Sequence, residues 1–137
     1  RDVLGSRGLG DVYKRQAYEE WVRFFLKATS AALSDAIGSI RKLCGLHEAD
    51  RQKVSESTAR PSVRERRLRF LDYLEHNPII EIKATAEALG LSFPTASKLV
   101  STFVELGVLQ ETTGRRRGRT FAYESYLAIL RKDAEPL

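Results

Sequence analysis

The chain has 137 residues, enough for one modest domain with a helical extension or for two very small domains. Its hydrophobic fraction of 42% and charged fraction of 30% are typical of soluble globular proteins, and no apolar run approaches the roughly 18 residues that a membrane span needs. A net charge of +5 permits an acidic partner such as nucleic acid, but a mild basic excess is also common on ordinary surfaces.

The first 16 residues, RDVLGSRGLGDVYKRQ, have neither a helical nor a strand period, and they lack the apolar core of a signal peptide. The part from Ser6 to Gln16 resembles the translation of a transposon-type sequencing adapter. We therefore expect residues 1–16 to be a disordered artefact, and the natural reading frame to continue upstream. The alternative is a natural basic arm that touches the DNA backbone.

Residues 17–55 are expected to be helical. No proline lies between Tyr18 and Lys53, and apolar residues recur at helical spacing at Trp21, Phe25, Ala28, Ala32, Ala36, Ile40 and Leu43. Gly45 offers a helix stop, so residues 46–54 form either a second short helix or the end of one kinked helix. Trp21, Phe24 and Phe25 make the first part apolar on more than one face. This is typical of a helix that packs on a partner, either a missing upstream domain or the rest of this chain.

The polar stretch 55–62 ends near a proline and predicts a domain boundary. A helix is expected from Val63 to His76, with leucines at positions 68, 71 and 74 on its inner side. Its charged residues are interpreted as a solvated face: Arg64, Glu65, Arg66, Arg67 and Arg69. Residues 78–82 form a short apolar link that can be an extended strand, and a short helix is expected from Ala84 to Leu89.

Gly90, Leu91 and Ser92 predict the tight turn of a helix-turn-helix, because glycine tolerates the positive φ of such a turn. Ser92 is a suitable N-cap for the next helix, and Pro94 fits its first turn. Ala96, Leu99, Val100, Phe103 and Leu106 fall on one side of that helix. The opposite side carries Thr95, Ser97, Lys98, Ser101 and Thr102. A small polar face with one lysine is what a recognition helix presents to the major groove.

Two alternating stretches, residues 108–112 and 120–123, predict the strands of a hairpin. The loop between them is bracketed by Gly114 and Gly118 and carries four arginines: Arg115, Arg116, Arg117 and Arg119. A loop of this length and charge directly after a helix-turn-helix is typical of a wing that holds phosphates. A short helix over residues 126–130 closes the domain. The fold is thus expected to be mainly α, with a helical extension followed by a winged helix-turn-helix over residues 63–131, made of three helices and a two- or three-stranded β-wing.

Three stretches resemble the C-terminal end of Fic family proteins, which transfer AMP from ATP to protein hydroxyls. YEEWVRFFLKAT resembles the closing helix of the Fic domain, LHEADRQKV the connector that follows it, and LSFPTASKLVSTFVELGVLQETTGRRRGRTFAYESYLAIL the winged helix appended in one Fic subgroup. The resemblance covers nearly everything after Ala17. The His-Pro-Phe catalytic motif and the phosphate-binding turn of the family are absent, so no catalytic residue carries over and the chain itself is not expected to be an enzyme.

Together these patterns predict a DNA-binding or regulatory module from a truncated Fic-type enzyme, with double-stranded DNA and the missing upstream Fic domain as partners. The alternative is a protein-interaction or dimerisation module that positions the enzyme on its target or forms a homodimer. A free-standing small transcription regulator would need a genuine N-terminus at the start of this chain.

The single Cys44 excludes an internal disulfide, and two histidines cannot assemble a Cys/His zinc site. We expect a cytoplasmic protein with no metal, no cofactor and no membrane partner.

Overall fold

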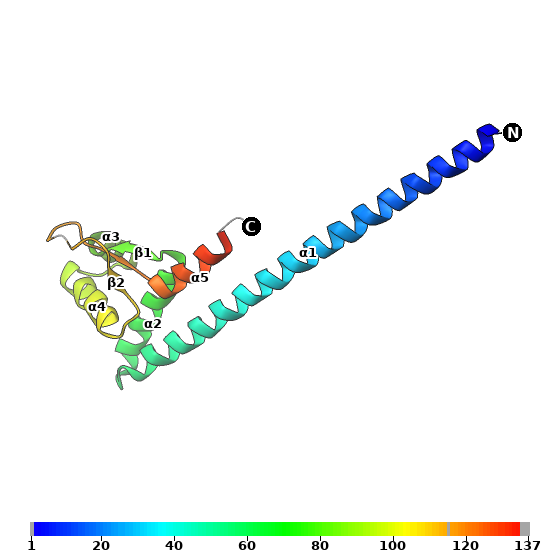
Figure 1. Ribbon diagram of the computed structural model, residues 1–137. Helices are drawn as coiled ribbons and strands as arrows, with labels where there is room; N and C mark the ends of the chain where they lie inside the picture. Colours follow the sequence, from blue (N-terminus) through cyan, green and yellow to red (C-terminus); the bar gives the residue numbers. More distant parts are fainter. Residues whose placement is uncertain (1, 115, 135–137) are drawn as a thin grey trace. The chain divides into compact units, whose positions relative to one another are not determined.

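The computed structural model describes the backbone of residues 2–114 and 116–134, and their side chains except those of residues 2–7 and 133. Within these residues lie five helices and one small antiparallel sheet, in the order α1, α2, β1, α3, α4, β2, β3, α5 (Figure 1). The expected mainly helical fold is confirmed. The chain forms two compact units, residues 1–38 and residues 39–137, which are described separately.

Helix α1 runs without a break from Asp2 to Glu56 and belongs to both units. It includes residues 2–16, where we expected disorder, and it passes through Gly45, where we expected a stop or a kink. Neither residues 2–16 nor the neighbourhood of Gly45 contains a proline, and a glycine in a helix costs only about 1 kcal/mol relative to alanine. Each residue added to an existing helix gains a backbone hydrogen bond without a new nucleation cost. The helix therefore continues through both places where the sequence pattern predicted that it would be absent or broken.

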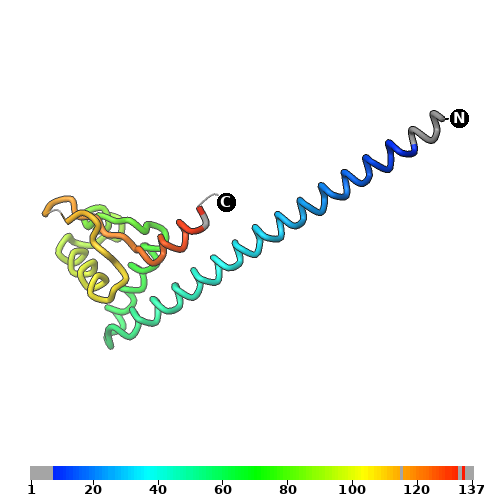
Figure 2. Tube along the Cα trace, in the orientation of Figure 1, coloured from blue at the N-terminus to red at the C-terminus, as the bar shows by residue number. Residues whose placement is uncertain are grey.

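The division between the units lies after Gly38, upstream of the polar stretch 55–62 where the sequence suggested a boundary. The last turns of α1 belong to the second unit because they contribute to its core: Val54 is fully buried, Asp50 is buried and Leu46 packs against the core. Figure 2 shows the short connection from α1 into α2. The polar stretch is therefore a tight corner within the second unit.

Guanidinium groups of α2 (Pro61–His76) hold this corner by binding its carbonyl oxygens. Arg64 donates to the carbonyl oxygens of Ser55 and Thr58, each at 3.1 Å, and Arg67 donates to the carbonyl oxygen of Ser57 at 3.2 Å. Pro61, with its fixed φ, occupies the first turn of α2. The helix thus begins two residues before the expected Val63.

Most of the core of the second unit comes from α2, α3 (Ile82–Leu89) and α4 (Phe93–Glu105). Leu71 and Leu74 are buried as the leucine spacing predicted, and Leu68 packs against the core as a partly buried side chain. Phe70, which the leucine pattern does not reveal, is fully buried and contacts Phe103 edge to face, with 4.6 Å between the ring centroids.

The turn between α3 and α4 follows the sequence prediction. Gly90 has a left-handed backbone with φ of 65°, and the N–H of Leu91 donates to the carbonyl oxygen of Ala86 at 2.9 Å. Leu91 packs against the core, and Ser92 is the N-cap of α4, accepting from the N–H of Thr95. Local residue chemistry therefore fixes how α4 begins.

The sheet contains β1 (Ile79–Glu81), β2 (Gln110–Glu111) and β3 (Thr120–Ala122) in the order β1-β3-β2. The apolar link after α2 is thus a strand, and Ile80 lies opposite Phe121. β2 is shorter than the expected 108–112, because the N–H groups of Val108 and Leu109 donate to the carbonyl oxygen of Phe103 at the end of α4. α5 (Glu124–Ala134) begins two residues before the expected position and is longer.

Candidate nucleic-acid interface

Helix α4 has one buried and one accessible side, as its sequence predicted. Ala96, Leu99, Val100 and Phe103 are buried in the core. Of the five candidate contact residues, Lys98 and Ser101 are exposed, and Thr95, Ser97 and Thr102 are half-buried. The structure therefore brings all five to the accessible side of one helix.

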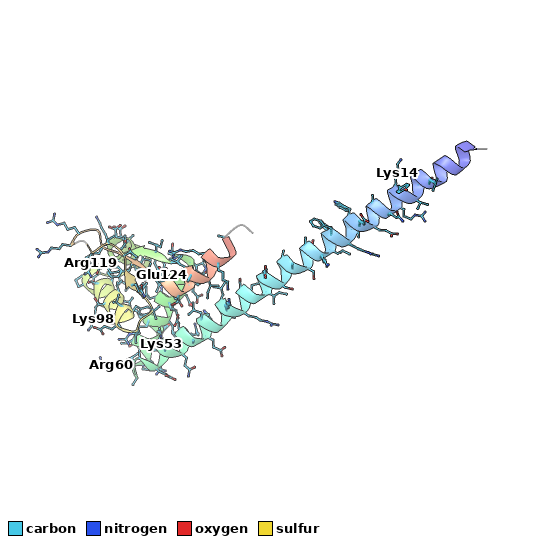
Figure 3. The ribbon with its side chains drawn as sticks, viewed as in Figure 1. Lys14, Lys53, Arg60, Lys98, Arg119 and Glu124 are labelled. Atoms are coloured by element: carbon cyan, nitrogen blue, oxygen red, sulfur yellow. The ribbon has the colours of Figure 1, made fainter. Side chains whose placement is uncertain are left out.

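The hydroxyl groups on this helix are held by local hydrogen bonds. The Thr95 hydroxyl lies 2.8 Å from that of Ser92 at the helix start, and the Thr102 hydroxyl donates to the carbonyl oxygen of Lys98 at 2.9 Å. The Lys98 ammonium forms no ion pair with any residue that the structure describes, and Figure 3 labels it on α4. Lys98 is thus a cation available to an external anion.

The hairpin between β2 and β3 carries the second group of candidate residues. Its base is closed by Thr112, whose N–H donates to the carbonyl oxygen of Thr120 at 2.9 Å, and by Thr113, whose hydroxyl accepts from the N–H of Thr120 at 3.1 Å. Arg116 and Arg117 are exposed in the loop, whereas Arg115 lies outside the described residues. The loop thus presents at least two guanidinium groups to solvent.

Arg119 differs from these loop arginines because it is already engaged. Its guanidinium donates two hydrogen bonds to the Glu111 carboxylate, at 2.7 and 2.5 Å, and lies over the Phe121 ring at 5.3 Å from the centroid. The hydrogen bond from Arg119 holds the pKa of Glu111 below its ordinary value. The sequence predicts four arginines as phosphate contacts, and the structure pairs this one with Glu111 across the hairpin.

A third basic group was missed by the sequence reasoning. A cavity of about 310 Å³ lies between the corner before α2, the first half of α2 and the accessible side of α4. It is lined by Thr58, Arg60, Val63, Arg66, Arg67, Thr95, Lys98, Leu99 and Thr102. The sequence pattern predicts only a solvated face for Arg66 and Arg67. The arginine-rich run was visible in the sequence, but which of its members meet α4 depends on how the two helices pack.

The first unit carries a different kind of surface. Trp21, Phe24 and Phe25 are 59%, 72% and 52% exposed, and the rings of Trp21 and Phe25 stack one helical turn apart, with 5.5 Å between their centroids. Within this unit, no described residue covers these rings.

Other chemistry is sparse among the described residues. None of their His, Cys, Asp and Glu side chains form a group of three that could hold a metal ion, and no described helix has the length and hydropathy of a membrane span. His47 is hydrogen-bonded to Glu75. Comparison of the chain with protein-family models, curated proteins and solved structures gave no match. Function is therefore inferred from the surfaces of α4 and the β2–β3 hairpin.

Proposed function

We propose that residues 63–131 form a winged helix-turn-helix domain that binds duplex DNA. In this proposal α3, the Gly90 turn and α4 are the helix-turn-helix, and the β2–β3 hairpin is the wing. The arrangement of three helices with a hairpin added to β1 supports it. The observation that carries the proposal is the accessible side of α4, which offers hydroxyls and a lysine without an ion pair among the described residues. Its one carboxylate, Glu105, stands at the last position of the helix.

The two basic elements have different roles in this proposal. Lys98 and Thr95 face base edges in the major groove and contribute to sequence preference. Arg116 and Arg117 contact phosphates, which position the protein on the duplex and carry no sequence information. Arg119 holds the hairpin through Glu111 and so acts on the wing's shape.

We further propose that this domain is the regulatory module of a Fic-type AMP-transferring enzyme. The support is the resemblance of the three stretches that begin at Tyr18, Leu46 and Leu91 to the end of such proteins. The chain contains neither the His-Pro-Phe motif nor the phosphate-binding turn of that family, so we expect it to transfer no AMP. Covalent transfer of label from radiolabelled ATP to the chain or to an added protein would contradict this expectation.

The exposed rings of the first unit support a second candidate function, a protein-interaction or dimerisation module. Its partner is either an upstream Fic domain or a second copy of the chain. Light scattering of the full chain and of a Trp21→Ser/Phe25→Ser variant distinguishes the two. A dimer that the double substitution converts to a monomer indicates a second copy, whereas a monomer in both proteins excludes self-association.

DNA binding is tested by fluorescence anisotropy of a labelled duplex at two salt concentrations. We expect weak binding by the full chain, with a dissociation constant of roughly 10⁻⁴ to 10⁻⁶ M, that weakens steeply as salt rises. An Arg116→Ala/Arg117→Ala variant should bind all duplexes more weakly and to the same degree. The slope of log K against log salt should flatten by about 0.9 for each phosphate that the variant no longer binds.

A Thr95→Ala/Lys98→Ala variant should instead change the preferred sequence in a binding-site selection. The free-energy difference between the right and the wrong base should fall by roughly 1 to 3 kcal/mol at each base that is no longer recognised.

The matched control is an Arg41→Ala/Lys42→Ala variant, which removes the same charge from exposed positions of α1. If the control and the loop variant show equally reduced affinity, binding follows net charge and the proposed interface is wrong. Salt-independent binding by the wild-type chain would contradict the phosphate contacts as well.

A further inference from the structure

The cavity between α2 and α4 has the chemistry of an anion site. Four of its lining side chains are cationic: Arg60, Arg66, Arg67 and Lys98. The lining also includes three threonines, at positions 58, 95 and 102, and it contains no carboxylate. A neighbouring cavity of about 370 Å³ on the same helix lacks this character, because Glu65 lies beside Arg66 and Arg69 in its wall.

Most of this positive charge is not neutralised by the protein. Arg60, Arg66 and Lys98 form no ion pair with any residue in the described part of the chain. The Arg67 guanidinium donates hydrogen bonds to the carbonyl and the hydroxyl oxygens of Ser57. Because both acceptors are uncharged, they do not neutralise its positive charge. Cations that converge without a counter-ion repel one another, and a bound anion relieves that repulsion.

The position of one wall is fixed by hydrogen bonds. Arg67 and Arg64 hold the backbone of the corner at Ser57 and Thr58, so Thr58 and Arg60 are kept beside the first half of α2. Val63 and Leu99 supply apolar surface between the polar groups. The site is thus a preformed concavity, in which guanidinium groups can donate paired hydrogen bonds to the oxygens of a phosphate.

We infer that this cavity binds a phosphate group. The inference rests on the proposed function for its ligand, because Thr95, Lys98 and Thr102 belong both to the cavity wall and to the proposed base-reading face of α4. A duplex whose bases are read by this face of α4 brings a backbone phosphate beside it, to Arg60, Arg66 and Arg67 on the other wall of the cavity. The cavity then binds the DNA backbone at a point separate from the phosphates bound by the β2–β3 hairpin. The proposed DNA interface thus extends to α2 and to the corner before it.

The test uses an Arg60→Ala/Arg66→Ala variant of the full chain. Neither side chain makes a hydrogen bond within the described residues, and Arg60 provides no side-chain cap for α2, so the fold should be retained. Arg67 is left unchanged because it holds Ser57. The control is again Arg41→Ala/Lys42→Ala, and thermal melting of both variants checks that the fold is intact.

In the duplex arm, the cavity variant should bind DNA more weakly than wild type at low salt. The ratio of wild-type to variant affinity should shrink by about 3.5-fold for each fourfold increase in salt, which corresponds to a slope change of about 0.9 for one phosphate. The control should keep the wild-type slope. In the second arm, inorganic phosphate and ADP are titrated into wild type and the cavity variant by calorimetry, which detects a site for free phosphate compounds without any DNA.

The outcomes separate the two proposals. A slope change in the cavity variant supports a backbone phosphate as the ligand, even if free phosphate binds too weakly to detect. Binding of ADP or inorganic phosphate to wild type but not to the cavity variant supports a free phosphate ligand, and it does so even if the wild-type chain fails to bind DNA and the proposed function falls. If the cavity variant keeps the wild-type slope and neither phosphate compound binds wild type, the phosphate site is overturned while DNA binding through α4 and the hairpin still stands.

Discussion

The hydroxyl of Tyr123 donates a hydrogen bond to the Asp50 carboxylate, joining the residue after β3 to the last turns of α1. The two residues are only 1% and 5% exposed. Burial raises the pKa of Tyr123, and the hydrogen bond to Asp50 raises it further. Because the partners lie 73 positions apart in the chain, this bond attaches the end of α1 to the domain.

A Tyr123→Phe substitution should lower the free energy of unfolding by about 1 to 3 kcal/mol, because it leaves the buried Asp50 carboxylate without its donor. Denaturant unfolding of the full chain measures the loss. The matched control is Tyr126→Phe, since the Tyr126 ring packs against Tyr123 but its hydroxyl makes no hydrogen bond with a described residue. Equal losses in the two variants would assign the effect to packing and not to the bond.

The raised pKa of Tyr123 also predicts how stability changes in alkali. Above the ordinary tyrosine pKa of about 10, the unfolded chain releases this proton while the folded chain keeps it, so unfolding is increasingly favoured as pH rises. The stability advantage of wild type over Tyr123→Phe should therefore be constant below about pH 9 and shrink above about pH 10, by at most about 1.4 kcal/mol per pH unit. Lysines and other tyrosines titrate in both proteins and cancel in the difference. An advantage that stays constant up to about pH 11 would contradict the buried, protonated phenol.

Two glycines in the second unit should respond to alanine in opposite directions. Gly90 has a φ of 65° and no atom within 4 Å of an added Cβ, so Gly90→Ala should destabilise the domain through backbone strain alone, by about 1 to 2 kcal/mol. Gly45 lies inside α1 and also has open space around it, so Gly45→Ala should stabilise by about 1 kcal/mol through helix propensity. Thermal melting of both variants is the measurement. Shifts of the melting temperature in the same direction would contradict either the left-handed turn at Gly90 or the unbroken helix at Gly45.

A Glu111→Gln substitution should strengthen binding of duplex DNA if the hairpin contacts phosphates as proposed. The change removes a negative charge, and with it the charged partner of Arg119. The N–H groups of the Arg119 guanidinium can then donate to a phosphate of the DNA backbone. The salt slope of binding should steepen by up to about 0.9, the value for one additional bound phosphate, in the anisotropy assay at neutral pH. Glu124→Gln is the control, because the Glu124 carboxylate pairs with Arg131 on α5 at 2.7 Å. If Glu124→Gln raises affinity equally, net charge explains the gain and Arg119 does not.

The sequence alone determined those features whose causes are local. The leucine spacing placed the inner side of α2, and Gly90 and Ser92 placed the turn and the start of α4, because a left-handed backbone and an N-cap depend on a few adjacent residues. The two sides of α4 followed from helical period, so all five of its candidate contact residues were found on its accessible side.

Only the tertiary structure decided the features that depend on distant partners. Asp50 belongs to the core because Tyr123 binds it, and the apolar link at Ile80 is a strand because Phe121 lies opposite it. In the same way, Arg119 is engaged because the hairpin register brings it to Glu111, and Arg66 lines a cavity because α2 packs beside α4. Composition and period state which residues are charged or apolar. Which charges remain unpaired depends on packing between segments far apart in the chain, and no local pattern contains that information.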